Sequence, residues 1–315
     1  MAELFGYFLA IDAIITWSVA SLVYKVGLEK TGIKGAVLFR LVMTSIATLI
    51  FSLLFGSFLF FTVLNAEQLV GFILSCLVSG LSVTIGDLMY FNSLKRIDAS
   101  RAFPLVQLSL VFVYPFAFFL FGEIITPTIL IGALLILSSV FLLGTKDKEE
   151  NNEEKDIEED LSEKENPDHL ITGIFLAVGA ALCWAIAIVA FNQARILSGD
   201  VFVPNFMRVS FAAIFIAILG IFQREYYSGY KKENRGILKY FIYIGIAGSL
   251  SLGLADSLFY KAAEINGLIL ISTITANTPM VQQLLSIIVL KEKFRKRFIL
   301  AVLLIIVGNY IILFL

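Results

Sequence analysis

The sequence predicts an all-α membrane protein with ten transmembrane helices, arranged as two inverted repeats of five helices each. Three observations predict this fold. The 315 residues are 59% hydrophobic, with a mean hydropathy of +0.90, whereas soluble domains are about 45–50% apolar. Apolar stretches long enough to cross a bilayer core of about 30 Å recur along the chain. The motifs of the first half return in the second half in the same order.

The helices are expected wherever about 20 mostly apolar residues follow one another. The first span follows the N-terminus without a basic leader or a cleavage site, so it is expected to be permanent. The ten expected spans are 5–24, 35–56, 68–91, 102–121, 125–144, 170–191, 201–221, 237–260, 267–290 and 298–315.

The repeat is visible in the first two helices of each half. The segment GYFLAIDAIITW (6–17) aligns with GIFLAVGAALCW (173–184), so that Trp17 corresponds to Trp184. In the second helices FRLV aligns with MRVS, so that Arg40 corresponds to Arg208.

The repeat continues through the third helices, where GDLMYF aligns with ADSLFY and Asp87 corresponds to Asp256. Each aspartate is followed 36 residues later by a glutamate, Glu123 or Glu292. These glutamates lie at predicted helix ends, where capping of the next helix is the expected role. A repeat of five helices inserts its second copy upside down, as in many secondary transporters.

A polar segment separates the two copies. Thr145 to Asp168 contains four lysines and twelve acidic residues, a composition typical of a disordered linker. The expected organisation is therefore a first repeat at 1–144, an acidic linker at 145–168 and a second repeat at 169–315.

Twenty of the 24 lysines and arginines lie in loops that follow odd-numbered helices, if the linker is included. Because basic loops stay in the cytoplasm, the linker is expected inside the cell and both termini outside.

Three aspartates lie within predicted spans, where a charge is costly and usually faces a cavity or a partner. Asp87 lies eight residues before Lys95, and Asp256 lies eight residues before Glu264, the charged residue that bounds each hydrophobic segment. At 1.5 Å per residue, each aspartate is about 12 Å from its charged boundary. In inverted copies this places both carboxylates near the midplane, within roughly 6 Å of one depth. The alternative is structural pairing with Arg40, Arg208 or Lys261. Asp12 is a weaker candidate because Gly179 occupies the corresponding place.

Other side chains complete the candidate site. Small residues lie one and two turns from each aspartate, and Tyr90 and Tyr260 lie close after them. Trp17 and Trp184 fall near mid-helix, which fits a packed core or a cavity wall. The fourth and ninth spans contain prolines that interrupt backbone hydrogen bonding. Their polar residues, which either contact a solute or join helices, are Gln107, Tyr114, Asn277 and Gln282.

The sequence contains few residues that could form an enzyme active site or a metal site. Cys76 and Cys183 lie within predicted spans and are expected to be small core residues. The single histidine, His169, lies at a helix start among charged residues and is expected to be solvated. We therefore expect no enzyme, no metal and no cofactor.

Together these motifs resemble the EamA family of the drug/metabolite transporter superfamily, whose members have two tandem five-helix repeats. The resemblance covers both copies and depends on Trp17, Trp184, Arg40 and Arg208 with the glutamates of FGEII and LKEKF. Family members commonly have basic residues after the second and fourth helices, which implies cytoplasmic termini. Those two loops contain none here, so the expected orientation is the opposite one.

The resemblance implies a plasma-membrane carrier that exports a small organic metabolite, most simply an amino acid, by alternating access. Asp87 and Asp256 are the candidates for a cationic group of the solute or for a coupling proton, because a partly desolvated carboxylate can bind a proton near neutral pH. A nucleotide-sugar or sugar-phosphate exchanger and a passive pore remain the alternatives. The expected partners are a solute and the lipid bilayer, and nothing indicates nucleic acid.

Overall fold

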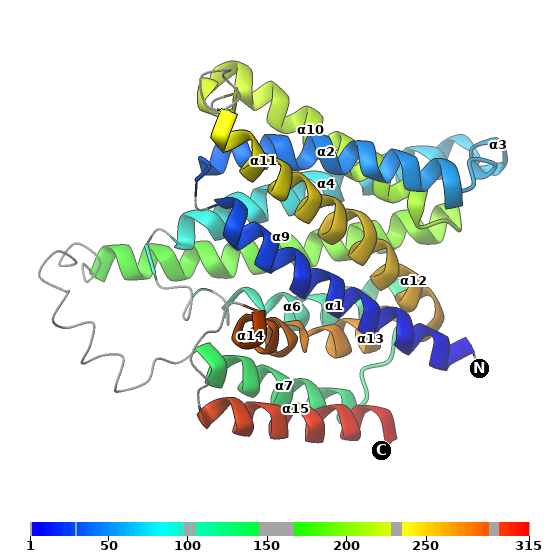
Figure 1. Cartoon of the computed structure of the whole chain (residues 1–315). Coiled ribbons are helices and arrows are strands. Elements are labelled where there is room, and N and C mark those ends of the chain that lie inside the picture. The colour runs from blue at the N-terminus through cyan, green and yellow to red at the C-terminus, as the bar shows by residue number, and fades with distance from the viewer. Residues whose placement is uncertain are drawn as a thin grey trace, which may run out of the picture. The chain divides into compact units, whose positions relative to one another are not determined.

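The structure, a computed structural model, describes residues 2–28, 30–94, 96–97, 102, 105–144, 167–227, 235–289 and 296–314. Every regular element among these residues is helical (Figure 1). The linker 145–168 lies outside the described residues except for its last two positions, and Pro104, Lys95 and Glu292 are also outside.

The helices follow one another along the chain with few described residues between them. The α-helices are α1 (Ala2–Leu28), α2 (Ile33–Phe55), α3 (Phe60–Val63), α4 (Ala66–Leu94), α6 (Ser109–Phe121), α7 (Pro127–Gly144), α9 (Pro167–Ser198), α10 (Phe202–Phe222), α11 (Arg235–Gly248), α12 (Asp256–Asn266), α13 (Leu268–Thr275), α14 (Thr278–Val289) and α15 (Lys296–Phe314). A 3₁₀ turn, η2 (Arg224–Tyr227), follows α10, and a π-helical segment, η4 (Ser249–Ala255), joins α11 to α12.

The helices confirm the predicted all-α membrane fold. Within the described residues, seven continuous stretches are long and apolar enough to cross a membrane: 2–24, 33–55, 66–93, 170–198, 202–222, 236–266 and 268–289. Three shorter apolar helices, at 111–121, 127–142 and 298–314, occupy the remaining predicted spans. The fourth span was expected from residue 102, but α6 begins at Ser109 because a turn at 107–108 interrupts the helix.

Two glycines allow sharp chain reversals between consecutive helices. Gly122 ends α6 with φ of 67°, and Gly267 separates α12 from α13 with φ of 87°. A side chain is disfavoured at such angles, so glycine permits these turns at little cost.

The chain divides into two compact units that do not coincide with the two sequence repeats. Unit 1 contains residues 1–83 and 186–292, and unit 2 contains residues 84–185 and 293–315. Helices α4 and α9 therefore contribute to both units. In unit 1, α1 packs against α11, α12 and α14, and α2 packs against α10 and α11. In unit 2, α7 packs along α15.

Within unit 1 the two copies contact one another reciprocally. A Cβ atom at Gly80 would overlap the carbonyl oxygen of Arg208, and one at Gly248 would lie 3.3 Å from the carbonyl oxygen of Arg40. Gly80 and Gly248 are 168 residues apart, as are Arg40 and Arg208. Each third helix thus approaches the second helix of the other copy at the same place, as inverted repeats require.

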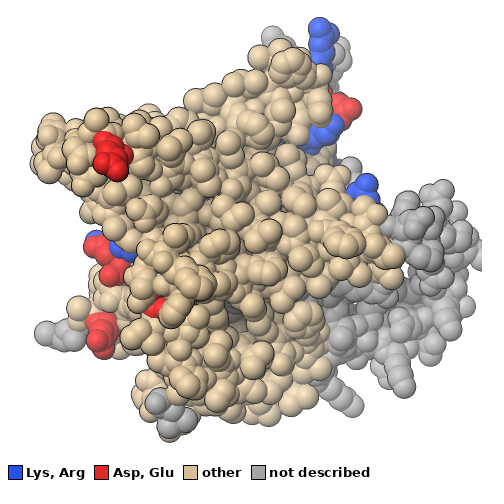
Figure 2. Space-filling view, turned by 180° about the vertical axis from the view of Figure 1, so that it is seen from behind, with Lys and Arg blue, Asp and Glu red and all other residues tan. Residues whose placement is uncertain are grey.

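The surface is largely apolar, as lipid contact demands. Large hydrophobic side chains such as Leu53, Phe119 and Phe222 are 66%, 79% and 81% exposed. Figure 2 shows that lysine, arginine, aspartate and glutamate are sparse on the face that it displays. Such surfaces are typical of proteins that are solvated by lipid tails.

We expect Gly80→Ala to destabilise the protein, because the new methyl group would collide with the backbone of α10. Overpacking of this kind costs about 1–3 kcal/mol. The matched control is Gly236→Ala on α11, where nothing lies within 4 Å of the new atom. Thermal unfolding of the purified protein in detergent would measure both variants. An unchanged unfolding temperature for Gly80→Ala would contradict the close helix approach.

Candidate functional site

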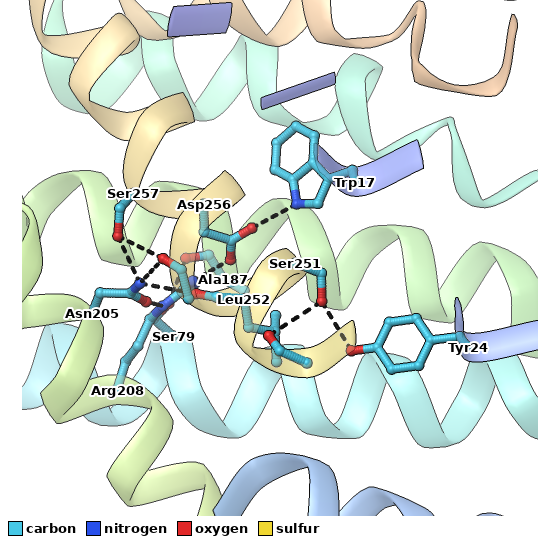
Figure 3. A network of polar contacts seen from close by, with 12 residues as sticks. Trp17, Tyr24, Ser79, Ala187, Asn205, Arg208, Ser251, Leu252, Asp256 and Ser257 are labelled. Atoms are coloured by element: carbon cyan, nitrogen blue, oxygen red, sulfur yellow. Dashed lines mark hydrogen bonds and ion pairs between the residues drawn. The ribbon is translucent and has the colours of Figure 1, made fainter. Parts of the chain in front are cut away.

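Asp256 is the centre of a buried polar network in unit 1 (Figure 3). It is the first residue of α12, and only 9% of its surface is exposed. The indole N–H of Trp17 on α1 donates a hydrogen bond to Asp256 Oδ1, over 2.9 Å. The other carboxylate oxygen forms an ion pair with the guanidinium of Arg208 on α10. One carboxylate therefore joins three helices.

Arg208 is held on several sides and is 2% exposed. Its Nε donates to Asn205 Oδ1, over 2.8 Å, one helical turn earlier on α10. Its guanidinium carbon lies 4.5 Å from the ring centroid of Phe191 and 5.6 Å from that of Tyr260. Cation–π contacts and an ion pair together compensate the cost of burying this charge.

Aromatic rings line the same region of unit 1. The rings of Phe191 and Tyr260 lie 3.9 Å apart between centroids, and those of Trp17 and Phe259 lie 5.6 Å apart. Tyr260 is 2% exposed. The cluster thus combines one carboxylate, one guanidinium and four aromatic rings.

Asp87 lies in a corresponding cluster within unit 2. It is 7% exposed and accepts a hydrogen bond from the indole N–H of Trp184, over 3.2 Å. Tyr90 packs on Trp184 with ring centroids 5.6 Å apart. A Cβ atom at Gly86 would lie 2.6 Å from the indole ring, so glycine is needed for the tryptophan to approach α4.

The two tryptophan–aspartate contacts are reciprocal between the sequence copies. Trp17 of the first copy binds Asp256 of the second, and Trp184 of the second copy binds Asp87 of the first. The sequence singled out all four residues but did not predict that they pair across the copies. Because Asp87 and Asp256 belong to different units, their meeting near the midplane stays a prediction.

Two further predicted residues lie where helices are interrupted. Gln107 and Asn277 both occupy non-helical turns, at 107–108 before α6 and at 276–277 between α13 and α14. The turns have the same backbone bond: Leu108 N–H donates to Leu105 O and Asn277 N–H donates to Ile274 O, each over 3.2 Å. Interrupted helices at matching places in two copies are typical of transporter binding regions.

The remaining predicted residues are more scattered. Asp12 is exposed on α1, Tyr114 is buried in α6, and Gln282 is half-buried in α14. The guanidinium carbon of Arg40 lies 5.6 Å from the ring centroid of Tyr24. Lys261 pairs with Glu264 over 2.8 Å.

Sequence reasoning missed Asn205 and Phe191, which hold Arg208. The available signal for Asn205 was its spacing, three residues before an arginine within a predicted span. Among the residues that the structure describes, no group of three or more potential ligands could hold a metal ion.

We expect Arg208→Met to destabilise the protein strongly, since it leaves the Asp256 carboxylate buried without its cation. Loss of one partner of a buried ion pair costs about 3–5 kcal/mol. The double variant Arg208→Met with Asp256→Asn should unfold at a higher temperature than Arg208→Met alone. Lys261→Met, which opens a half-exposed ion pair, is the control and should have little effect. Additive losses in the double variant would contradict the pairing.

Comparison with known proteins agrees with this architecture. The model of the EamA-like transporter family matches residues 4–145 and 171–314. A relative from Archaeoglobus fulgidus, described as an uncharacterized transporter, is 31% identical over 113 residues, which are 36% of this chain and 34% of that relative. One solved crystal structure, 19% identical in sequence, shares the fold with a TM-score of 0.68 over 98% of this chain and 95% of the other. The family match spans both halves, so this multi-pass membrane protein belongs to the EamA-like transporter family, within the drug/metabolite transporter superfamily.

Proposed function

We propose that this transporter is a secondary-active carrier that moves amino acids or closely related metabolites outward by alternating access. The observation that supports the proposal is the buried Asp256–Arg208 pair with its aromatic surroundings. A zwitterionic solute has both charges of this pair. Its ammonium group would replace the guanidinium at Asp256, and its carboxylate would replace Asp256 at Arg208.

Exchange of this kind leaves each buried charge with a partner of opposite sign before and after the solute binds. The two protein charges are mutually compensated without a solute, so the resting site leaves neither charge buried alone. When a zwitterion enters, Asp256 exchanges the guanidinium for the solute's ammonium group. Arg208 exchanges the Asp256 carboxylate for the carboxylate of the solute. The flat rings of Phe191, Tyr260 and Trp17 offer apolar contact to the solute's side chain.

Asp87 is proposed as the second carboxylate of the cycle and as a candidate for the coupling proton. Its donor, Trp184, corresponds by sequence to the donor of Asp256. A proton taken up on one side and released on the other would couple transport to the proton gradient.

We expect Asp256→Asn and Asp87→Asn to lower transport, because a hydrogen bond to a charged group contributes about 1.5–3 kcal/mol, or roughly 10–100-fold in affinity. The substrate would first be sought by thermal-shift measurements with amino acids, nucleotide sugars and sugar phosphates. Counterflow of the labelled hit into proteoliposomes would then compare the variants, with and without a pH gradient.

Glu67→Gln, an exposed acid in the first turn of α4, is the matched control. Unchanged transport and pH dependence in both aspartate variants would overturn the role of the carboxylates. Stabilisation only by phosphorylated compounds would favour the exchanger alternative, and flux without saturable counterflow would indicate a pore.

We also propose that the linker 145–168 lies in the cytoplasm of the plasma-membrane protein and that both termini lie outside. The support is the excess of basic residues in loops that follow odd-numbered helices. The segment between α6 and α7 joins the fourth predicted span to the fifth. Because it follows an even-numbered span, it should lie on the outer side.

Cysteine labelling would measure this orientation in intact cells. In a background with Cys76→Ala and Cys183→Ala, Ser162→Cys in the linker should be protected from a membrane-impermeant maleimide. Ile124→Cys, at a position that is 78% exposed, should react. The reverse pattern would show that the termini are cytoplasmic.

A further inference from the structure

The second copy contains one residue more than the first between two equivalent positions. Asp87 lies seven positions after Gly80 (87 − 80), whereas Asp256 lies eight positions after Gly248 (256 − 248). The glycines are structurally equivalent, because each approaches the arginine of the other copy's second helix. The aspartates are equivalent too, because each accepts a hydrogen bond from the other copy's tryptophan. The extra residue therefore lies between Gly248 and Asp256.

The extra residue can be located more closely by alignment. If Ser249 is omitted, GLSLGLAD of the second copy aligns with GLSVTIGD of the first, with Leu250 on Leu81 and Ser251 on Ser82. Ser249 is the first residue of the π-helical segment η4. Its hydroxyl donates to Gly245 O, four residues earlier in the same helix, over 2.9 Å.

The π-helical segment absorbs this residue without changing the face on which the aspartate lies. At about 100° per residue, seven residues of α-helix return to nearly the same face, whereas eight overshoot by about 80°. In η4 the Asp256 N–H bonds to Ser251 O, five residues earlier, as in a π-helix. The corresponding helix of the first copy, α4, is α-helical throughout.

Asn205 of α10 occupies the backbone acceptors of the widened segment. Its Nδ2 donates to Leu252 O over 2.9 Å, to Gly253 O over 3.0 Å and to Ser257 Oγ over 3.0 Å (Figure 3). Asn205 is 1% exposed, so these bonds form out of contact with solvent. The same side chain accepts the bond from Arg208 Nε through Oδ1.

The first copy has neither part of this arrangement. By the offset of 168 that relates Arg40 to Arg208, the position of Asn205 corresponds to Val37. Valine is buried there and has no side-chain donor. The extra residue and the amide therefore occur together in the second copy and are both missing from the first.

We propose that Asn205 is a positioning residue: anchored on the carbonyl groups of η4, it sets the direction in which Arg208 meets Asp256. The planar guanidinium has a fixed fork of donors. When Asn205 accepts from Nε, the terminal Nη2 is directed at the Asp256 carboxylate. The extra residue widens η4, and the carbonyl groups of Leu252 and Gly253 in this segment are the acceptors that hold the amide in this rotamer. The inference concerns the geometry of the ion pair, and it holds whether or not the pair contacts a solute.

The protein's two tryptophans allow a test that needs no substrate. Trp17 donates to Asp256, and Trp184 donates to Asp87, so each indole reports on one aspartate. In protein labelled with 5-fluorotryptophan, ¹⁹F NMR should give two resonances, which Trp17→Phe and Trp184→Phe would assign. Trp184 then serves as an internal reference.

We expect Asn205→Val to displace the Trp17 resonance by more than its line width and to leave the Trp184 resonance in place. The matched control is Asn192→Val, which removes another buried asparagine that accepts from the Nε of an arginine three residues later, Arg195, over 3.1 Å. The control should leave the Trp17 resonance unchanged. An unmoved Trp17 resonance in Asn205→Val would overturn the proposal.

Deletion of Ser249 separates positioning from simple stabilisation. In the otherwise native protein, this deletion should turn η4 into a regular α-helix, in which the Asn205 amide loses its acceptors. The unfolding temperature should therefore fall. Combined with Asn205→Val, the deletion restores the first copy's pattern and should recover stability. The Trp17 resonance should nevertheless stay displaced, because nothing then holds Arg208 Nε. If stability and resonance recover together, Asn205 is structural only.

Arg208→Lys provides a second route should Asn205→Val fail to fold. Lysine keeps the positive charge but has no counterpart of the Nε donor. The Trp17 resonance should move in this variant as well. A resonance at the native position would show that the direction of the guanidinium does not affect Asp256.

Discussion

The buried ion pair between Arg208 and Asp256 is the interaction on which the arrangement of unit 1 depends. A charge in an apolar interior is tolerated only when a partner compensates it, so α10 and α12 must stay together wherever this pair is formed. Trp17 adds α1 through its bond to the same carboxylate, and Asn205 adds η4 through the backbone. Three separate parts of the chain, α1, α10 and the continuous η4–α12 segment, are thereby held together by one carboxylate and the groups around it.

The tryptophan donors of both aspartates come from the opposite copy, so neither copy satisfies its carboxylate entirely from its own residues. The duplication has kept this geometry while the chemistry at the helix ends has diverged. At one end of the α2–α10 pair, Lys34 donates to Gln223 over 3.0 Å and pairs with Glu225 over 2.8 Å. At the positions that the repeat relates to Lys34 and Gln223, Phe202 and Phe55 pack with ring centroids 5.6 Å apart. Salt weakens the contacts of Lys34 but not the contact between the two aromatic rings. The contacts at the two ends of the α2–α10 pair can therefore differ in strength under the same conditions.

Helix positions were predictable from the sequence because the length of an apolar stretch is set by the bilayer. The interruptions before α6 and before α14 fell at polar residues that the sequence had singled out, Gln107 and Asn277. The partners of the tryptophans were not predictable, since they depend on how two inverted copies pack. Asn205 was not predicted, because one asparagine in an apolar helix produces no periodic signal and only its spacing from Arg208 marks it. The extra residue can be found in the sequence, because the offset between the copies changes from 168 at Gly80 to 169 at Asp87. The structure adds that a π-helical segment accommodates this residue.

That segment also bears on why the two aspartates need not do the same work. In a strictly two-fold protein, equivalent carboxylates would have equal surroundings and would respond alike to a solute or a proton. Here one inserted residue widens the helix before Asp256 and exposes carbonyl groups to Asn205, whereas α4 stays regular before Asp87 and Val37 occupies the place of the amide. π-Helical turns occur frequently at functional sites. The extra residue leaves Gly248 and Asp256 in the same contacts as Gly80 and Asp87. It nevertheless gives the two aspartates different surroundings, so that equivalent acids of the two copies can have different chemical roles.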